Sequence, residues 1–274
     1  MKKQTLSVLF CLMAVFAIVS CNKNNSKTES KPQEVSDATL AQIKAYGFST
    51  NDVHATDNGV IVEGDIFLSH EQLAQKVSGP TLQVANTEQY RTTNLVTGLP
   101  RTITVLVTGL GSAFIAGADT AIARYNALGL RIKFQRITSG KATITIQGFN
   151  QGPSGGYITL GSSGFPTSSG NPYGTIKMNT NQYAYGSNPN VLYVGSVIQH
   201  EIGHCIGMRH TDYMDRSYSC GGTPTNEGTA GVGAIQIPGT PSGPDANSWM
   251  LACSNGGNRT FNANDVIAMN YLYH

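Results

Sequence analysis

The sequence predicts an α+β or α/β domain with a twisted mixed sheet, a helix that backs it, a helix with a histidine motif, an irregular lower subdomain and a C-terminal helix. Residues 101–107 alternate Thr with Ile and Val, the period of a strand, and residues 130–137 and 141–147 are two further strand-like runs. Residues 112–128 have Ala, Ile and Tyr at helical spacing and end at Gly129. Strands separated by such a helix fold as a sheet backed by that helix.

The later part of the chain is less regular. Residues 174–179 form a further strand candidate, and residues 194–206 form the motif helix, whose apolar positions bury it. Many Gly and Pro residues lie between residues 221 and 244, as expected around an active site. Residues 261–273 close the chain as a helix. Two residues can cap this last helix: Asn262 and Asn264.

The N-terminus has the pattern of an export signal. A basic start precedes an apolar run that is too short for a membrane span, so residues 1–20 are predicted to be a signal peptide. Small residues before Cys21 resemble a bacterial lipoprotein processing site, and we expect Cys21 to carry the lipid. The alternative is an ordinary signal peptide with an incidental cysteine. Residues 21–35 are polar and suit a flexible tether.

The composition agrees with export. Charged residues make up 12% of the chain and the formal net charge is +2, which is too small to suggest a nucleic-acid partner. We expect a monomer at the cell envelope or surface, held to the membrane by its lipid until processing and possible release to the extracellular space.

Three cysteines remain for the folded part. An oxidising compartment favours a disulfide, and we expect it between Cys220 and Cys253, where it ties the loop after the histidine motif to a segment near the C-terminus. Cys205 lies inside the motif helix and is expected to pack as a small apolar residue. One thiol is left over whichever pair forms.

The strongest signal in the chain is the motif H-E-x-x-H-x-x-G-x-x-H, which begins at His200. His200 and His204 are one helical turn apart and face the same way, so both can bind one metal ion. Gly207 can take a left-handed conformation that ends the helix and lets His210 return to the metal. Three His ligands leave one position open, which is the layout of a catalytic zinc site. The alternative, a buried helix with hydrogen-bonded histidines, does not explain Glu201 or the Gly207–His210 continuation.

This motif resembles that of the metzincin metallopeptidases. Its residues are most similar to those of the bacterial dual-action HEIGH metallopeptidase family, and the resemblance covers roughly residues 35–274. The resemblance implies a metzincin-like catalytic domain in residues 91–274, with Met250 in the Met-turn. In astacin- and serralysin-like relatives a Tyr follows that Met by two residues, where this chain has Ala252. A Tyr ligand or oxyanion donor from that position is therefore absent.

The resemblance also gives residues 36–90 a role as a pro-segment. In astacin-like zymogens, an apolar residue followed by any residue, Gly and Asp places that Asp on the zinc. The run Val62 to Asp65 matches this form, with Val in place of the usual aromatic residue. We expect Asp65 to be a latency ligand that fills the fourth zinc position. Residues 60–66 form a short strand-like run. The alternative is that Asp65 lies in a turn beside Gly64. The polar stretch at residues 78–91 is the expected boundary.

The predicted function is that of a secreted zinc endopeptidase, made as a latent zymogen and acting on protein or peptide substrates. Zinc activates water and polarises the carbonyl, and Glu201 acts as general base and then as general acid. Substrate is expected to add to an edge strand at residues 157–160. Asp212 is expected either to accept a hydrogen bond from a ligand imidazole or to cap a turn. Two alternatives are a lipoprotein binding module without turnover and a zinc hydrolase of cell-wall peptides.

Overall fold

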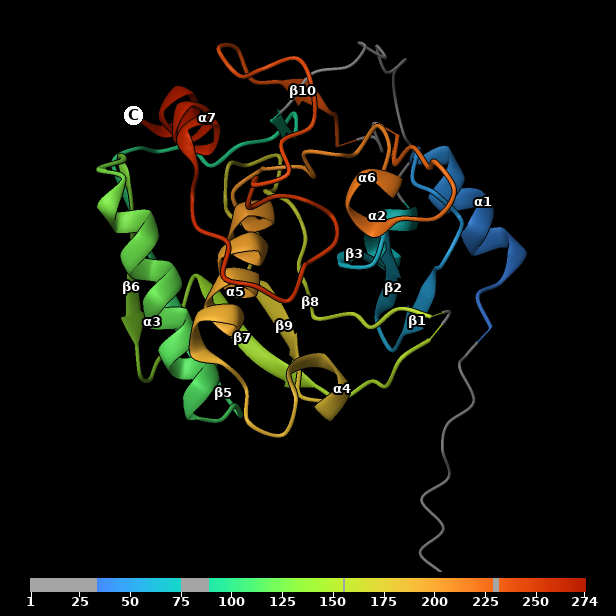
Figure 1. Ribbon diagram of the computed structural model, residues 1–274, viewed down its shortest axis with the longest axis horizontal. Helices are drawn as coiled ribbons and strands as arrows, with labels where there is room; N and C mark the ends of the chain where they lie inside the picture. The colour runs from blue at the N-terminus through green and yellow to red at the C-terminus, as the bar shows by residue number, and fades with distance from the viewer. Residues whose placement is uncertain (1–33, 75–88, 155, 229–231) are drawn as a thin grey trace, which may run out of the picture. The chain divides into compact units, whose positions relative to one another are not determined.

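The computed structural model describes residues 34–74, 89–154, 156–228 and 232–274 (Figure 1). The predicted signal peptide, Cys21 and nearly all of the predicted tether lie outside these residues. Among the described helices, none has the length and apolar character required to cross a membrane. The boundary placed at residue 90 between pro-segment and catalytic domain stays a prediction.

The centre of the fold is a mixed sheet of five strands in the order β6-β5-β7-β9-β8. Its strands β5 (Arg101–Thr108), β6 (Ile132–Ile137), β7 (Ile144–Phe149) and β9 (Thr175–Asn179) run parallel. The short edge strand β8 (Gly161–Ser162) is antiparallel to β9. The predicted mixed sheet is confirmed. The edge was predicted wrongly, however, because Tyr157 makes only an isolated bridge to Ser154 and the paired edge follows at Gly161.

Two helices pack against each other on this sheet, α3 (Ser112–Ala127) and α5 (Val191–Cys205) (Figure 1). They approach closely because both have glycine at the contact: a Cβ at Gly117 would lie 2.8 Å from a methyl group of Val194. Asn190 caps α5 by accepting hydrogen bonds from two backbone amides of its first turn. The predicted backing helix and motif helix are both present, and the buried face of α5 joins the core formed by the sheet.

The C-terminal helix α7 (Ala263–Tyr273) is also as predicted. Asn262, one of the two expected caps, forms a capping box with Asp265: each side chain binds the other residue's backbone amide. Asp265 is fully buried and reaches further into the molecule, where it also accepts hydrogen bonds from Ser248 and Gln89.

The N-terminal part of the described chain forms its own small layer. Helices α1 (Asp37–Ala45) and α2 (His70–Ala74) accompany a three-stranded antiparallel sheet of β1 (His54–Thr56), β2 (Gly59–Val62) and β3 (Ile66–Ser69). Its apolar core includes Phe165, which follows β8 in the chain. β3 also joins the edge of the central sheet: the amide of Phe67 donates to Ser163 O at 2.8 Å, and the amide of Ser163 donates to Asp65 O at 3.0 Å.

The β2–β3 pair corrects one expectation. Residues 60–66 were predicted as one strand, but Val62 pairs with Ile66, so residues 63–65 are the tip of a hairpin. Glu63 and Gly64 have φ of +55° and +88°, which turns the chain back on itself. Asp65 is therefore presented at the end of a hairpin.

The chain between α5 and α7 is irregular, as predicted. Its short elements are α6 (Ser217–Cys220) and β10 (Ile235–Gln236), which pairs with β4 (Tyr90–Arg91). One further short helix, α4 (Gln182–Tyr185), precedes α5. Cys220 and Cys253, the pair favoured from the sequence, form a disulfide with a sequence separation of 33 residues. Cys205 is buried and is not disulfide-bonded.

Candidate metal centre and active site

The motif helix presents two imidazoles on one face and then stops. His200 and His204 lie one turn apart on α5, whose opposite face is held by buried residues such as Ile198 and Ile202. Gly207 has φ +107°, as expected for the residue that ends this helix. The amide of Met208 then turns back to donate to Gly203 O at 2.9 Å, and the chain continues to His210.

Four side chains converge on one point. The Nε2 atoms of His204 and His210 are 3.1 Å apart, and Oδ2 of Asp65 lies 3.1 Å from Nε2 of His200 and of His210 and 3.8 Å from that of His204. One donor atom from each of the four residues lies within 4.8 Å of all the others. Zinc–nitrogen bonds of about 2.0–2.1 Å in a tetrahedron give ligand–ligand distances of about 3.3 Å. The donor set therefore fits a zinc ion.

The second nitrogen of each imidazole is already hydrogen-bonded. Nδ1 of His200 lies 3.0 Å from Trp249 O, and Nδ1 of His204 lies 2.9 Å from Met208 O. Nδ1 of His210 lies 2.7 Å from Oε1 of Glu227. An oxygen acceptor at Nδ1 fixes the ring and its tautomer, so that Nε2 of each ring is the atom left for a metal.

Glu227 is a functional residue that sequence reasoning missed. It is fully buried and lies in a loop 17 residues after His210. Burial alone would raise the pKa of Glu227, but His210 and two neighbouring arginines lower it to about 2. Asp212, which sequence analysis considered for this role, instead accepts from the Ser219 hydroxyl and from the Ala252 amide. Asp212 is therefore a loop-stabilising residue, and no spacing in the sequence signals Glu227.

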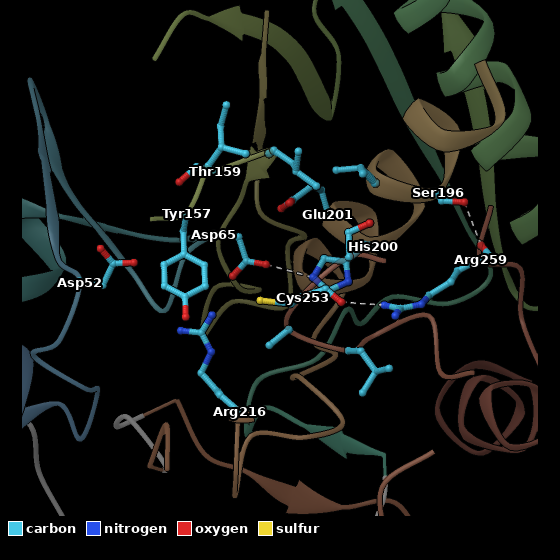
Figure 2. Close-up of a pocket in the computed structure, with 18 of the residues that line it drawn as sticks. Asp52, Asp65, Tyr157, Thr159, Ser196, His200, Glu201, Arg216, Cys253 and Arg259 are labelled. Carbon is cyan, nitrogen blue, oxygen red and sulfur yellow. Dashed lines mark hydrogen bonds and ion pairs between the residues drawn. The ribbon is translucent and has the colours of Figure 1, made fainter. Parts of the chain in front are cut away.

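Glu201 lies beside the His cluster and lines the cleft over it (Figure 2). The Ser163 hydroxyl donates to Oε2 of Glu201 at 2.7 Å. A Cβ at Gly161 would lie 2.8 Å from Oε1, so the edge strand leaves room for this carboxylate by having no side chain there. Burial and the nearby charge of Asp65 raise the pKa of Glu201 well above its usual value. The raised pKa favours proton uptake by Glu201, and one hydroxyl holds its carboxylate.

Asp65 approaches from the other side of the cleft. In Figure 2 its carboxylate points toward His200, and the dashed line marks their contact. Burial would raise the pKa of Asp65, but the charge of His210 and hydrogen bonds from the three imidazoles hold it well below its usual value. An ionised carboxylate is therefore the form that faces the metal ligands.

The predicted Met-turn residue, Met250, is buried beneath the cluster. The amide of Thr211 donates to Met250 O at 2.8 Å, next to the third histidine. The Ser248 hydroxyl accepts from the Met250 amide and donates to Asp265 on α7. Through these bonds the C-terminal helix supports the turn whose Trp249 carbonyl orients His200.

A buried group of charges surrounds the site, and sequence reasoning did not foresee it. Arg209 is fully buried, with Nη2 3.5 Å from Glu227 and 3.7 Å from Glu63 at the hairpin tip. Nε of Arg216 lies 3.3 Å from Glu227. Burial and the charge of Glu227 raise the pKa of Glu63. The hairpin tip and the metal-site loop thus meet at a buried group of ionisable side chains.

Known proteins resemble this chain in sequence. The profile of the dual-action HEIGH metallo-peptidase family matches residues 60–273. The chain belongs to this family. It is therefore a metallopeptidase, and its His-rich cluster could hold the metal ion that the family implies. The family match begins at β2 and so includes Asp65 as well as the histidine motif.

Two solved structures of myroilysin resemble the chain in fold. The first is 16% identical in sequence with a TM-score of 0.42, and the match covers 66% of this chain and 96% of the myroilysin chain. The second is 18% identical in sequence with a TM-score of 0.39, and the match covers 64% of this chain and 83% of the myroilysin chain. No curated protein matches the chain significantly.

Proposed function

We propose that this protein is a zinc-dependent endopeptidase in which Glu201 is the general base and Asp65 keeps the uncleaved chain latent. The observation that carries the proposal is the convergence of three Nε2 atoms, each with its Nδ1 bonded to an oxygen, beside a cleft-lining carboxylate. A set of three imidazoles with one further position suits catalytic zinc.

The chemistry follows from these positions. A bound zinc ion supplies Lewis acidity toward the scissile carbonyl and lowers the pKa of water. Glu201 accepts the proton from the attacking water and then delivers it to the leaving amine. Ser163 holds one oxygen of Glu201 by its hydroxyl, which leaves the other oxygen for water. In the uncleaved chain, β3 forms backbone hydrogen bonds with Ser163 at the sheet edge next to β8. The same backbone groups can bind an extended substrate peptide once β3 has left.

Latency is supported by the position of the hairpin tip. Oδ2 of Asp65 lies 3.1 Å from two ligand nitrogens, so this oxygen competes for the position that water needs. β3 also lies against Ser163 at the sheet edge, where an extended peptide would pair. Removal of residues 36–90 would free both positions at once.

Export and anchoring are proposed from the sequence alone. Residues 1–20 have the form of a signal peptide and Cys21 the form of a lipid-attachment site, so the uncleaved protein is placed at the cell envelope. Cleavage within residues 78–91 would leave the lipid on the pro-segment and release the catalytic domain. Of the two alternatives, the family assigns a peptidase rather than a binding module, and cell-wall peptides remain a second candidate substrate.

The test combines metal content with peptide hydrolysis, on protein purified from residue 22 onward, before and after limited proteolysis near residues 78–91. We expect one zinc per chain in both forms and hydrolysis of an unstructured protein only after the cut. Equal hydrolysis before and after the cut would contradict latency. Absence of zinc, or of hydrolysis from the cut and metal-loaded chain, would contradict the peptidase assignment.

A further inference from the structure

One carboxylate serves three cationic partners next to the metal site. Glu227 lies 2.7 Å from Nδ1 of His210, 3.3 Å from Nε of Arg216 and 3.5 Å from Nη2 of Arg209. A single negative charge cannot balance two guanidinium groups. This part of the catalytic region therefore has an excess of positive charge that another anion must balance when water is excluded.

In the intact chain the ionised Asp65 at the hairpin tip supplies that anion, and its charge acts on Arg216. The second carboxyl group of the tip, that of Glu63, has Oε2 3.7 Å from Arg209. A Cβ at Gly64 would lie 3.2 Å from Nη2 of Arg216, so this guanidinium faces the middle of the hairpin tip. When the pro-segment departs, both carboxylates leave together and the excess positive charge is exposed.

Arg209 and Arg216 differ in their access to substrate once the pro-segment has been removed. Arg209 is enclosed by aromatic rings and donates to the carbonyls of Gly228 and Gly233, so it stabilises the loop around it. The side chain of Arg216 is 17% exposed and lines the cleft. Figure 2 shows Arg216 pointing toward the side of the cleft where Asp65 and Tyr157 lie.

We propose that Arg216 binds a carboxylate of the substrate, so that the activated enzyme favours peptides with an acidic group beside the cleaved bond. This inference rests on the proposed function, because it requires removal of the hairpin. The planar guanidinium suits a carboxylate, which it can bind with two parallel hydrogen bonds. The acidic group is either an Asp or Glu side chain or the C-terminal carboxylate of a short peptide.

Other charged groups at the cleft do not fill this role. Arg259 also lines it, but donates to Cys253 O at 3.0 Å and lies on the other side of His200 from Arg216 (Figure 2). Asp52 belongs to the pro-segment and leaves with it. Asp212 acts on Arg216 from a distance, but both of its oxygens are hydrogen-bonded, to Ser219 and Ala252.

The test uses zinc-loaded, processed enzyme and three peptides of otherwise equal sequence. The first has Asp beside the cleaved bond and an amidated C-terminus, the second has Asn in its place, and the third has Asn and a free C-terminus close to the bond. We expect a kcat/KM at least about tenfold higher for one of the acidic peptides than for the neutral one. Whichever acidic peptide shows the gain identifies the source of the carboxylate.

Variants assign this preference to one residue. Arg216→Gln should lose most of the ratio in kcat/KM between the acidic and the neutral peptide, while Arg216→Lys should retain part of that ratio. Arg136→Gln, an arginine whose partner is Asp119 on α3, is the control and should behave as the parent protein. Equal cleavage of all three peptides, or loss of the preference in Arg259→Gln but not in Arg216→Gln, would overturn the proposal.

Binding separates this inference from the peptidase assignment. If no peptide is cleaved, the assigned activity fails, but affinities for the same peptides can be measured calorimetrically with the Glu201→Gln variant. Tighter binding of an acidic peptide that disappears on adding Arg216→Gln supports the role of Arg216. Equal affinity for acidic and neutral peptides overturns it.

Discussion

Gly203 lies directly against the indole of Trp249: a Cβ at Gly203 would be 2.4 Å from Cη2 of that ring and 2.7 Å from the sulfur of Met250. This contact explains why glycine stands between the two histidines of α5. The helix can lie on the Met-turn only where it has no side chain, and the carbonyl of Trp249 then reaches Nδ1 of His200.

Gly203→Ala should therefore damage both stability and the metal site. The added methyl group must displace Trp249 or Met250, at a cost of about 1–3 kcal/mol in the free energy of unfolding. Because Trp249 orients His200, zinc affinity should fall as well. Denaturant unfolding and chelator competition measure the two effects. Gly243→Ala is the control, because a Cβ there meets nothing within 4 Å; equal behaviour of both variants would argue against the contact.

Glu201→Gln should retain zinc and lose turnover. The amide keeps the size of the side chain but cannot accept the proton of water, so kcat should fall by about 10²–10⁴-fold. Metal analysis and peptide hydrolysis on the processed enzyme check both parts. A variant with normal metal content and parental kcat would remove Glu201 from the mechanism.

Asp65→Ala should activate the uncleaved chain. Without this carboxylate the fourth position beside the histidines becomes available to water, and we expect hydrolysis by the intact protein to rise at least about tenfold. Asp57→Ala is the matched control, since Asp57 is an exposed residue of the same segment. The intact length of the chain must be verified by mass spectrometry. Unchanged activity and unchanged processing in Asp65→Ala would refute the latency role.

Glu227→Gln should weaken zinc binding. Glu227 accepts from Nδ1 of His210 and thereby fixes the ring that offers Nε2 to the metal. Loss of such an acceptor lowers metal affinity by about 10–100-fold, which competition with a chromophoric chelator measures. Glu71→Gln on the short helix α2 is the control, because Glu71 is exposed. Parental affinity in Glu227→Gln would show that the ring is held by other contacts.

Asp265 should make stability depend on pH. Burial raises the pKa of Asp265 from 3.8 to about 7. Between these two values the folded chain keeps the proton that the unfolded chain releases. The stabilisation from this group is therefore fully present below about pH 4 and is lost as the pH rises to about 7. Above that pH the contribution of Asp265 to stability no longer changes. The loss should be about 2–4 kcal/mol. Asp265→Asn should remove it. Denaturant unfolding of the parent protein and of Asp265→Asn at a series of pH values tests this prediction. If the free energy of unfolding depends on pH in the same way for both proteins, the prediction is wrong.

Local patterns in the sequence determined the helices and the metal ligands. The spacing of His200 and His204 needs only helical geometry, and the left-handed Gly207 needs only its missing side chain to end α5. The cap at Asn262 and the strand alternation in β5 are also read from neighbouring residues. These features are set by interactions within a few residues, which is why they could be predicted.

Tertiary structure decided the partners of those ligands. Glu227 reaches His210 from a loop without periodicity, and Ser163 reaches Glu201 from the sheet edge. The edge itself was predicted a few residues too early, because pairing partners rather than composition define it. Residues 60–66 were predicted as one strand, although positive φ at Glu63 and Gly64 folds them into a hairpin. Each of these features either joins residues that are far apart in the chain or depends on a turn. A single sequence does not show which distant polar groups contact one another once folding buries them.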